Sequence, residues 1–418
     1  MGVCMKRTLA LLAVLCAAAA LGAQDGTLLR FKYKKDDNYR ILSTVREDVK
    51  VNGRLNHRAE IVSRVTITVT DVDENGTGTM DGTFMTSEKS TGAGGNERLG
   101  WGETFQSQYK RDGRGTFDIA DTFFMPTIRD MPILPEHPVK AGDTWTASGY
   151  EAEDLRREPL FIEKPFKVPF VAEYEYLRDE EGISSDAKHT AKTFQVISVK
   201  YNLFYESPLP DDAWQLGDIP AATMGYSHRI IYWDNEKGQI DHADEQFRIV
   251  IESARGNRFD FSGTTHEEIT EFTRTATEET LKDVQEKIEQ LGLQDVSVTK
   301  GEKGLTISVE NIQFKPDSAE LTEREQAKIR KIATILEAYP DNDLLVSGHT
   351  ALAGTETARQ QLSEARAEAV ADFLTGMGVR EKNRVFTQGF GARIPIASNK
   401  TEEGKAKNRR VEITILDK

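Results

Sequence analysis

The sequence predicts an α+β protein: an N-terminal antiparallel β-rich domain, then a second domain in which helices pack on one mixed sheet. Three observations support this prediction. Apolar residues alternate with polar ones from about residue 28 to residue 251, a pattern typical of half-buried strands. From about residue 305 onward, strand patterns alternate with helix patterns. The 418-residue chain is also 38% hydrophobic, which is enough apolar material for more than one core.

Residues 1–23 have the features of an export signal peptide. Lys6 and Arg7 precede a short apolar stretch, and small residues up to Ala23 form a cleavage zone. Both cysteines of the sequence lie in this segment, so the exported chain would hold no disulfide and no cysteine-metal site. Lipidation of Cys16 is the less favoured alternative, because a bulky leucine precedes it where a small residue is expected.

Residues 24–262 are predicted to form the β-rich domain, whose role the sequence does not reveal. A run such as Ile197, Val199 and Tyr201 alternates with polar neighbours, and turn residues separate the runs. Two arrangements remain open, a water-exposed antiparallel sheet and an outer-membrane β-barrel with a lipid-facing apolar band. Charged residues interrupt many of the strands and the mean hydropathy is −0.51, which favours the water-exposed sheet.

Residues 263–299 are predicted to form a linker rich in Thr and Glu, followed by a helix. Leu281, Val284 and Ile288 have helical spacing, and Gly292 is a plausible stop.

Residues 300–418 are predicted to form the second domain. Thr322 with Glu325 three residues later is typical of a helix start. A longer helix is expected further on, and it carries Arg359 and Arg366 seven residues apart, so both lie on one side of it. The expected elements cover 305–314, 322–339, 344–348, 355–377, 384–388 and 410–416.

Composition and motifs argue against several function classes. A formal charge of −14 and a pI near 5.2 are not typical of a nucleic-acid binder, which needs clustered cations. The sequence lacks the nucleophile-elbow, P-loop and dinucleotide-binding signatures. We therefore expect no enzymatic activity, no cofactor, no metal and no nucleic-acid partner.

One set of separated motifs points to a known family. In order and spacing these motifs resemble the OmpA C-terminal-like peptidoglycan-binding family, and the resemblance does not extend to the β-rich domain. The motifs are Ile312 to Leu321, Gly348-His349-Thr350, Gly354-Thr355, Leu362-Ser363-Glu364 with Arg366-Ala367, and Asn408 to Ile413.

The resemblance implies an OmpA-like β/α sandwich that holds the stem peptide of peptidoglycan without breaking bonds. In the family, an Asp after the Gly-His-Thr strand and the Arg of the following helix hold the zwitterionic end of diaminopimelate by charge-assisted hydrogen bonds. This sequence keeps the arginine as Arg366 but has Ala351 in place of the Asp. Loss of that carboxylate is expected to cost about 1.5–3 kcal/mol of binding to diaminopimelate.

Two interpretations of this change remain open. In the first, the domain still binds peptidoglycan with an altered preference, and Arg366 and Arg359 with Arg410 nearby hold an anionic ligand. In the second, the site is vestigial and the domain is an architectural or protein-interaction module. The residues expected at the site are Arg366, Arg359, Thr350, Ala351, Leu362, Asp317 and Arg410. Glu356 is a further candidate for the missing carboxylate.

The sequence thus predicts a non-enzymatic cell-envelope protein tethered to the wall by its OmpA-like domain. The expected partner is the peptidoglycan stem peptide, while other envelope proteins and an outer-membrane association remain open. The expected location is the periplasm or outer membrane of a diderm bacterium. In a third interpretation, the β-rich domain is the outer-membrane barrel that the OmpA-like domain anchors.

Overall fold

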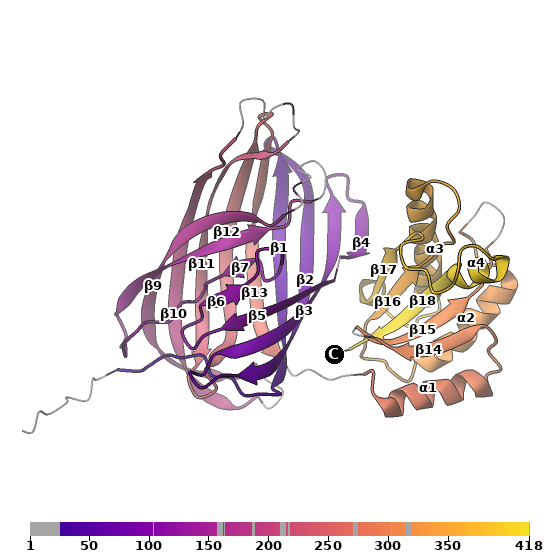
Figure 1. Ribbon diagram of the computed structural model, residues 1–418, viewed down its shortest axis with the longest axis horizontal. Helices are drawn as coiled ribbons and strands as arrows, with labels where there is room; N and C mark the ends of the chain where they lie inside the picture. Colours follow the sequence, from indigo (N-terminus) through magenta and orange to yellow (C-terminus); the bar gives the residue numbers. More distant parts are fainter. Residues whose placement is uncertain are drawn as a thin grey trace, which may run out of the picture.

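The computed structural model describes residues 26–102, 104–156, 162, 164–185, 189–209, 215, 218–270, 275–301, 303–314 and 319–417. The predicted export signal and Cys16 lie outside these residues. A large antiparallel sheet forms the N-terminal part, and a smaller mixed sheet with helices forms the C-terminal part (Figure 1). This arrangement confirms the predicted fold class.

The N-terminal sheet contains 13 strands, and every pairing within it is antiparallel. The strands are β1 (Asn38–Val51), β2 (Arg54–Val72), β3 (Gly78–Gly92), β4 (Glu97–Trp101), β5 (Phe105–Arg111), β6 (Phe117–Ile119), β7 (Ile128–Arg129), β8 (Thr144–Glu153), β9 (Phe166–Ile183), β10 (Ala191–Glu206), β11 (Pro220–Asp234), β12 (Gln239–Ser253) and β13 (Arg258–Thr270).

The strand order shows how the chain closes this sheet. Neighbours run β6-β5-β3-β2-β1-β13-β12-β11-β10-β9-β8-β7, and β4 pairs with β3. The first and last strands are therefore hydrogen-bonded partners in the middle of the sheet, with Val45 opposite Thr265. The short strands β6 and β7 form the two ends of the order. The sheet is strongly curved, and β5, β6 and β7 lie across its concave side (Figure 1).

Alternation of side chains gives the curved sheet an inner and an outer face. On β1, Tyr39, Ile41, Val45 and Glu47 point to the concave side, whereas Arg46 on the outer face pairs with Glu60 of β2 at 2.8 Å. Part of the concave side is a packed core. There the rings of Trp233 and Tyr174 are fully buried.

Residues 263–270, which the sequence analysis placed in the linker, belong to β13. They pair with β1 on one side and β12 on the other. The Thr-rich composition that suggested a connection is also compatible with a strand, because β-branched Thr is favoured in sheets. The backbone pairing with β1 and β12 shows that these residues form a strand and not a linker.

The C-terminal part has a five-stranded sheet of order β14-β15-β18-β16-β17, in which only the β16–β17 pair is parallel. Thr277, Thr322 and Thr355 cap the three long helices, as their side chains accept hydrogen bonds from the first turns. The elements are α1 (Glu278–Gln290), β14 (Val296–Lys300), β15 (Gly304–Glu310), α2 (Glu323–Leu336), β16 (Leu344–Gly348), α3 (Glu356–Gly376), a 3₁₀ turn (Lys382–Arg384), β17 (Val385–Gly389), α4 (Glu402–Asn408) and β18 (Arg410–Leu416).

Helix α1 and strand β14 belong to the C-terminal core, although the sequence analysis assigned the helix to the segment before the second domain and predicted no strand at 296–300. Val284 and Ile288 of α1 pack in the same buried cluster as α2, α3 and the sheet. Strand β14 pairs with β15. The apolar spacing that predicted this helix therefore marks a face that packs on the OmpA-like sheet.

Both faces of the C-terminal sheet are covered, which explains why every residue of β16 is buried. Leu344 and Val346 face the helices, while Leu345 points to the opposite side. There Leu345 packs with Trp101 of the N-terminal sheet, and Arg64 of β2 forms an ion pair with Asp343 at 2.9 Å. The two parts are therefore in direct contact.

No helix within the described ranges is long and apolar enough to cross a membrane.

Candidate functional site

The candidate site lies where β16 ends against helix α3. Gly348, the last residue of β16, has no room for a side chain, because a Cβ there would lie 2.0 Å from the backbone oxygen of Ser363. This close approach places the middle of α3 directly beside the chain that follows β16. The Gly-His-Thr and Leu-Ser-x-x-Arg motifs therefore meet in space as well as in the sequence pattern.

Hydrogen bonds hold Thr350 and the loop after β17 in fixed positions. The Thr350 backbone N–H donates to the oxygen of Gly391 at 2.8 Å, and the Gly391 N–H donates to the Ser363 hydroxyl at 2.9 Å. The buried Thr350 hydroxyl has no hydrogen-bond partner among the described residues. A buried hydroxyl without a partner is costly, so this atom suits a ligand that can hydrogen-bond to it.

Arg366, which the resemblance identifies as the ligand-binding arginine, has no ion-pair partner among the described residues. Its guanidinium lies 4.8 Å from the centre of the Phe314 ring, and its Nε is buried without a partner in the described part of the chain. Burial and the neighbouring Arg409 lower the pKa of Arg366. An arginine side chain still remains protonated at neutral pH, so within the described part of the chain the site presents a cation without an anion.

Arg359 lies on the same helix, but its side chain is directed away from Arg366. Its Nη1 donates to the backbone oxygen of Gly354 at 2.5 Å, just before the helix begins. The two arginines are about 10 Å apart along the helix axis, given a rise of about 1.5 Å per residue. They are therefore placed to contact two separate points of an extended ligand, and less suited to hold one carboxylate together. The Nε of Arg359 is likewise buried without a described partner.

The Asn408-Arg409-Arg410 motif divides into three structural roles. The Asn408 amide oxygen accepts hydrogen bonds from the backbone of Ile396 and Ala397, which shapes the loop before α4. Arg410 is only 2% exposed and donates to Glu412 at 2.7 Å, so its charge is already compensated.

Arg409, and not Arg410, is the residue whose charge acts on Arg366. Arg409 is the C-cap of α4 and directly precedes β18, so the boundary between this helix and the strand was the signal that could have separated Arg409 from Arg410. The Phe314 ring was likewise part of a recognised motif without an assigned role.

His349 belongs to the support of the site. It is buried, and its ring stacks on Phe390 with centroids 5.1 Å apart. Its Nε2 lies 3.4 Å from a Glu412 oxygen, and burial lowers the pKa of the imidazole despite that neighbour. His349 is therefore neutral at pH 7 and fills space beneath the loop.

The remaining predicted residues are placed as follows. Ala351 is 6% exposed and directly follows Thr350. Leu362 is 39% exposed on α3 and can offer an apolar surface to a ligand. Glu356 is exposed in the first turn of α3 and forms no ion pair with Arg366. Asp317 lies outside the described residues.

Together these residues form a site rich in hydrogen-bond donors. Arg366 and Arg359 each have a buried donor nitrogen without a described partner, and Arg409 adds a second positive charge beside Arg366. The site can hold an anion or a carbonyl-rich ligand by charge-assisted hydrogen bonds.

Comparison with known proteins places this site in a family. Residues 313–409 match the model of the OmpA family, and this segment is an OmpA-family domain. The chain is similar to the Probable lipoprotein YiaD of Escherichia coli K12, with 40% identity over 121 residues, which cover 29% of this chain and 55% of that relative. It is 41% identical over 104 residues to the Peptidoglycan-binding protein ArfA of Mycobacterium tuberculosis H37Rv, covering 25% of this chain and 32% of that protein.

A third relative is the Outer membrane porin F of Pseudomonas aeruginosa, with 39% identity over 105 residues, or 25% of this chain and 30% of that protein. The chain thus spans about half or less of the length of these relatives. Among solved structures, an outer membrane protein from Borrelia burgdorferi B31 is 39% identical; the match covers 29% of this chain and 96% of that chain, with a TM-score of 0.25.

Proposed function

We propose that the OmpA-family domain of this protein binds the stem peptide of peptidoglycan non-covalently and tethers the N-terminal sheet to the cell wall. The observation that carries the proposal is the Arg366 guanidinium, which is held over Phe314 and has no anionic partner within the described residues. A peptidoglycan-binding protein is among the relatives of the chain, which supports the choice of ligand. We infer no enzymatic role.

We further propose that the ligand preference differs from that of family members with an Asp after the Gly-His-Thr strand. Ala351 offers no carboxylate to the ammonium end of diaminopimelate, whereas Arg409 adds positive charge beside Arg366. An ammonium group would be repelled there, while a free carboxylate of the stem peptide would be attracted. The domain should therefore prefer a stem-peptide terminus that is anionic and not zwitterionic.

We also infer an envelope location. The relatives include proteins named as an outer membrane porin and as a probable lipoprotein, and the N-terminal segment predicts export. A stable tether to the wall requires that the OmpA-family domain face the compartment that contains peptidoglycan. Whether residues 24–262 contact the outer membrane is tested by fractionation of cells that express the chain.

The test is co-sedimentation of the purified full chain with native peptidoglycan, using walls whose diamino acids differ. Arg366→Ala should weaken binding about 10- to 100-fold, which corresponds to the loss of one charge-assisted partner. Ala351→Asp should raise affinity for the diaminopimelate-type wall by a similar factor, because it restores the carboxylate that holds the ammonium.

Arg330→Ala is the matched control for the loss of an arginine. Arg330 also lies over a phenylalanine of this domain, 5.1 Å from the Phe373 centroid, but on α2. The Arg330→Ala variant should bind the wall as the parent does. Equal losses for Arg330→Ala and Arg366→Ala would contradict the assignment of the site. If the parent chain binds no wall preparation and only Ala351→Asp gains binding, the site is vestigial and the domain is an architectural module.

A further inference from the structure

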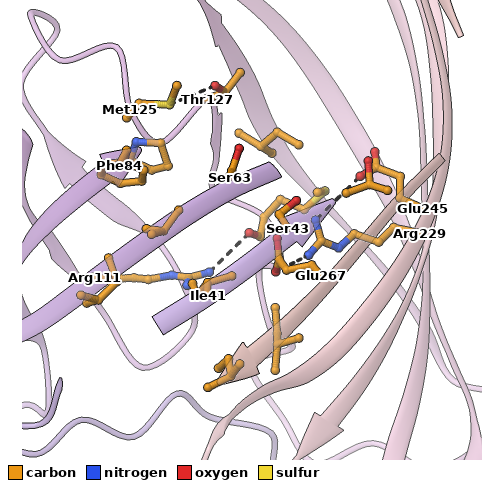
Figure 2. A pocket seen from close by; sticks show the side chains of 18 of the residues that line it. Ile41, Ser43, Ser63, Phe84, Arg111, Met125, Thr127, Arg229, Glu245 and Glu267 are labelled. Carbon is orange, nitrogen blue, oxygen red and sulfur yellow. Dashed lines mark hydrogen bonds and ion pairs between the residues drawn. The ribbon is translucent and has the colours of Figure 1, made fainter. Parts of the chain in front are cut away.

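The N-terminal sheet encloses a second candidate site that is independent of the OmpA-family domain. A cavity of about 920 Å³ lies on the concave side of the sheet, between β1, β2 and β13 and the strands that cross in front of them. This volume is near the upper end of small-molecule sites in proteins. Figure 2 shows its lining, with Ile41 and Phe84 on one wall and Arg229, Glu245 and Glu267 on another.

The cavity has apolar walls along its length, and its carboxyl groups gather toward the end formed by Glu47, which we call the polar end. The inward residues of β1 are Tyr39, Ile41, Ser43, Val45 and Glu47. Ile41 is opposite Val65 of β2, while Ser43 is opposite Glu267 of β13. One ligand that spans the cavity would therefore meet hydrocarbon side chains along its length and carboxyl groups at the polar end.

Arg229, at the polar end, already has carboxylate partners within the protein. Arg229 forms an ion pair with Glu267 at 2.7 Å and lies 3.8 Å from Glu245, so a single cation faces two carboxylates (Figure 2). The Ser227 hydroxyl donates to Glu245 at 2.6 Å. Arg229 is therefore neutralised by Glu245 and Glu267, and it offers no free positive charge to an anionic ligand.

Three further carboxyl groups at the polar end have no cationic partner among the described residues. These are Glu47 of β1 and Glu151 and Glu153 of β8, all of which line the cavity. Glu151 is 3% exposed; its Oε1 accepts a hydrogen bond from Tyr201 at 2.8 Å, and its Oε2 accepts none from the other described side chains. The carboxyl groups of Glu151 and Glu153 can share a hydrogen bond only when one of them is protonated.

The energetics of these carboxyl groups point to a missing cation. Burial raises the pKa of Glu151, with Glu153 adding to the effect, and burial with Glu88 and Glu153 raises the pKa of Glu47 to about 7. Raised pKa values mean that these groups hold their protons more tightly than exposed carboxyls do, and a positive charge placed among them would favour their ionised forms.

Arg111 is the competing feature, since an anionic head group could pair with it at the opposite end. Its guanidinium, however, lies against the rings of Phe31 and Phe117, 3.9 and 4.7 Å from their centroids. It also donates to the backbone oxygens of Gly115 and Met131. These contacts satisfy Arg111 within the wall, whereas Oε2 of Glu151 has no such contact.

We propose that this cavity binds an amphiphile whose apolar chain lies along the β1–β3 wall and whose protonated amine head is held by Glu47, Glu151 and Glu153. The head group would donate hydrogen bonds to carboxylate oxygens, including Oε2 of Glu151. The chain would replace water on the side chains of Ile41, Val65 and Phe84. This site does not depend on peptidoglycan binding.

The test is calorimetric titration of the purified full chain at pH 8 with dodecylamine, butylamine and dodecanoate, each below its micelle concentration. Dodecylamine should bind at least about tenfold more tightly than dodecanoate, because the two share a chain and differ in the sign of the head group. Butylamine should bind at least about 100-fold more weakly than dodecylamine, since each buried CH₂ contributes about 0.8 kcal/mol.

The double variant Glu47→Gln with Glu153→Gln should reduce the affinity for dodecylamine about tenfold or more and leave that for dodecanoate unchanged or improved. Glu60→Gln is the matched control, since Glu60 is on the outer face of β2 and pairs with Arg46. Near-ultraviolet circular dichroism verifies that each variant is folded. Equal affinity for the two dodecyl probes, tight dodecanoate binding that depends on Arg111, or insensitivity to the double variant would each overturn the proposal.

Discussion

The two candidate sites of this protein carry surplus charges of opposite sign. At the C-terminal site, Arg366 has no anionic partner among the described residues, and Arg409 adds a second positive charge beside it. In the N-terminal cavity, Glu47, Glu151 and Glu153 lie at the polar end without an ion-pair partner among the described residues. Arg410, in contrast, is compensated by Glu412. Charge without a described ion-pair partner is therefore a feature that the two sites share, and it indicates ligands of opposite charge.

The sites also differ in how the chain assembles them. The C-terminal site is built from the end of one strand and one helix that almost touch, so a few short motifs specify it. The cavity is built from single residues on many strands, and it exists only because β1 pairs with β13, more than two hundred residues away along the chain. A substitution at the strand–helix contact should therefore destroy one site outright, whereas single changes in the cavity should be absorbed.

The largest effect is expected from Gly348→Ala, which tests the strand–helix contact. The new Cβ would lie 2.0 Å from the Ser363 oxygen, so α3 must shift away from β16. We expect a loss of about 3 kcal/mol in the free energy of unfolding, measured by denaturant titration, together with loss of wall binding.

Gly376→Ala is the control for that experiment. Gly376 is the last residue of α3, and a Cβ there would meet nothing within 4 Å. Because Ala is favoured over Gly in helices, this variant should be neutral or up to about 1 kcal/mol more stable. If Gly348→Ala is as stable as Gly376→Ala, the C-terminal site tolerates a shift of α3 away from β16. It would then be no more sensitive to a single substitution than the cavity is.

A smaller effect, dependent on pH, is expected from Glu47→Gln in the cavity. The pKa of Glu47 is raised from 4.5 to about 7, so the folded protein holds its proton more tightly than the unfolded chain does. The stability contributed by this group is complete below about pH 4.5 and is lost as the pH rises through 7. Glu47→Gln should therefore match the parent at pH 4 and exceed its unfolding free energy by about 1–3 kcal/mol at pH 8.

Chemical denaturation at both pH values measures this difference. If the free energy of unfolding depends on pH in the same way for Glu47→Gln and the parent, Glu47 does not have a raised pKa in solution. The cavity would then hold less uncompensated negative charge than we infer. Addition of dodecylamine to the parent at pH 8 should produce a stabilisation of the same sign, because a bound cation stabilises the ionised carboxylates.

Much of the C-terminal part could be predicted from the sequence, for a physical reason. Its helices begin at capping residues such as Thr322 and Thr355, and its strand β16 was predicted with the same bounds that the structure shows. These are local signals. Arg409 was missed because the motif drew attention to Arg410; the chain passes from helix α4 to strand β18 between the two residues, and only the structure shows which of them acts on Arg366.

The N-terminal part shows where such prediction ends. Alternation identified the strands, but the concave and outer faces look alike in the sequence, since Arg46 and Glu47 are neighbouring charged residues. Only the pairing of β1 with β2 and β13 decides which of them enters the cavity. Residues 263–270 illustrate the same point, because their composition suited both a linker and a strand.

The smallest effect is expected from Arg46→Ala, and it tests this last distinction between faces. Arg46 pairs with Glu60 at 2.8 Å, but both side chains are largely exposed, at 67% and 44%. Exposed ion pairs contribute between zero and about 1 kcal/mol, so the unfolding free energy should change by less than about 0.5 kcal/mol and show no new dependence on pH between 4 and 8. If Arg46→Ala instead reproduced the pH-dependent change expected for Glu47→Gln, the side chain facing the cavity would be Arg46. The concave wall would then carry a cation where a carboxylate is assigned, and the opposite charge of the two sites would no longer hold.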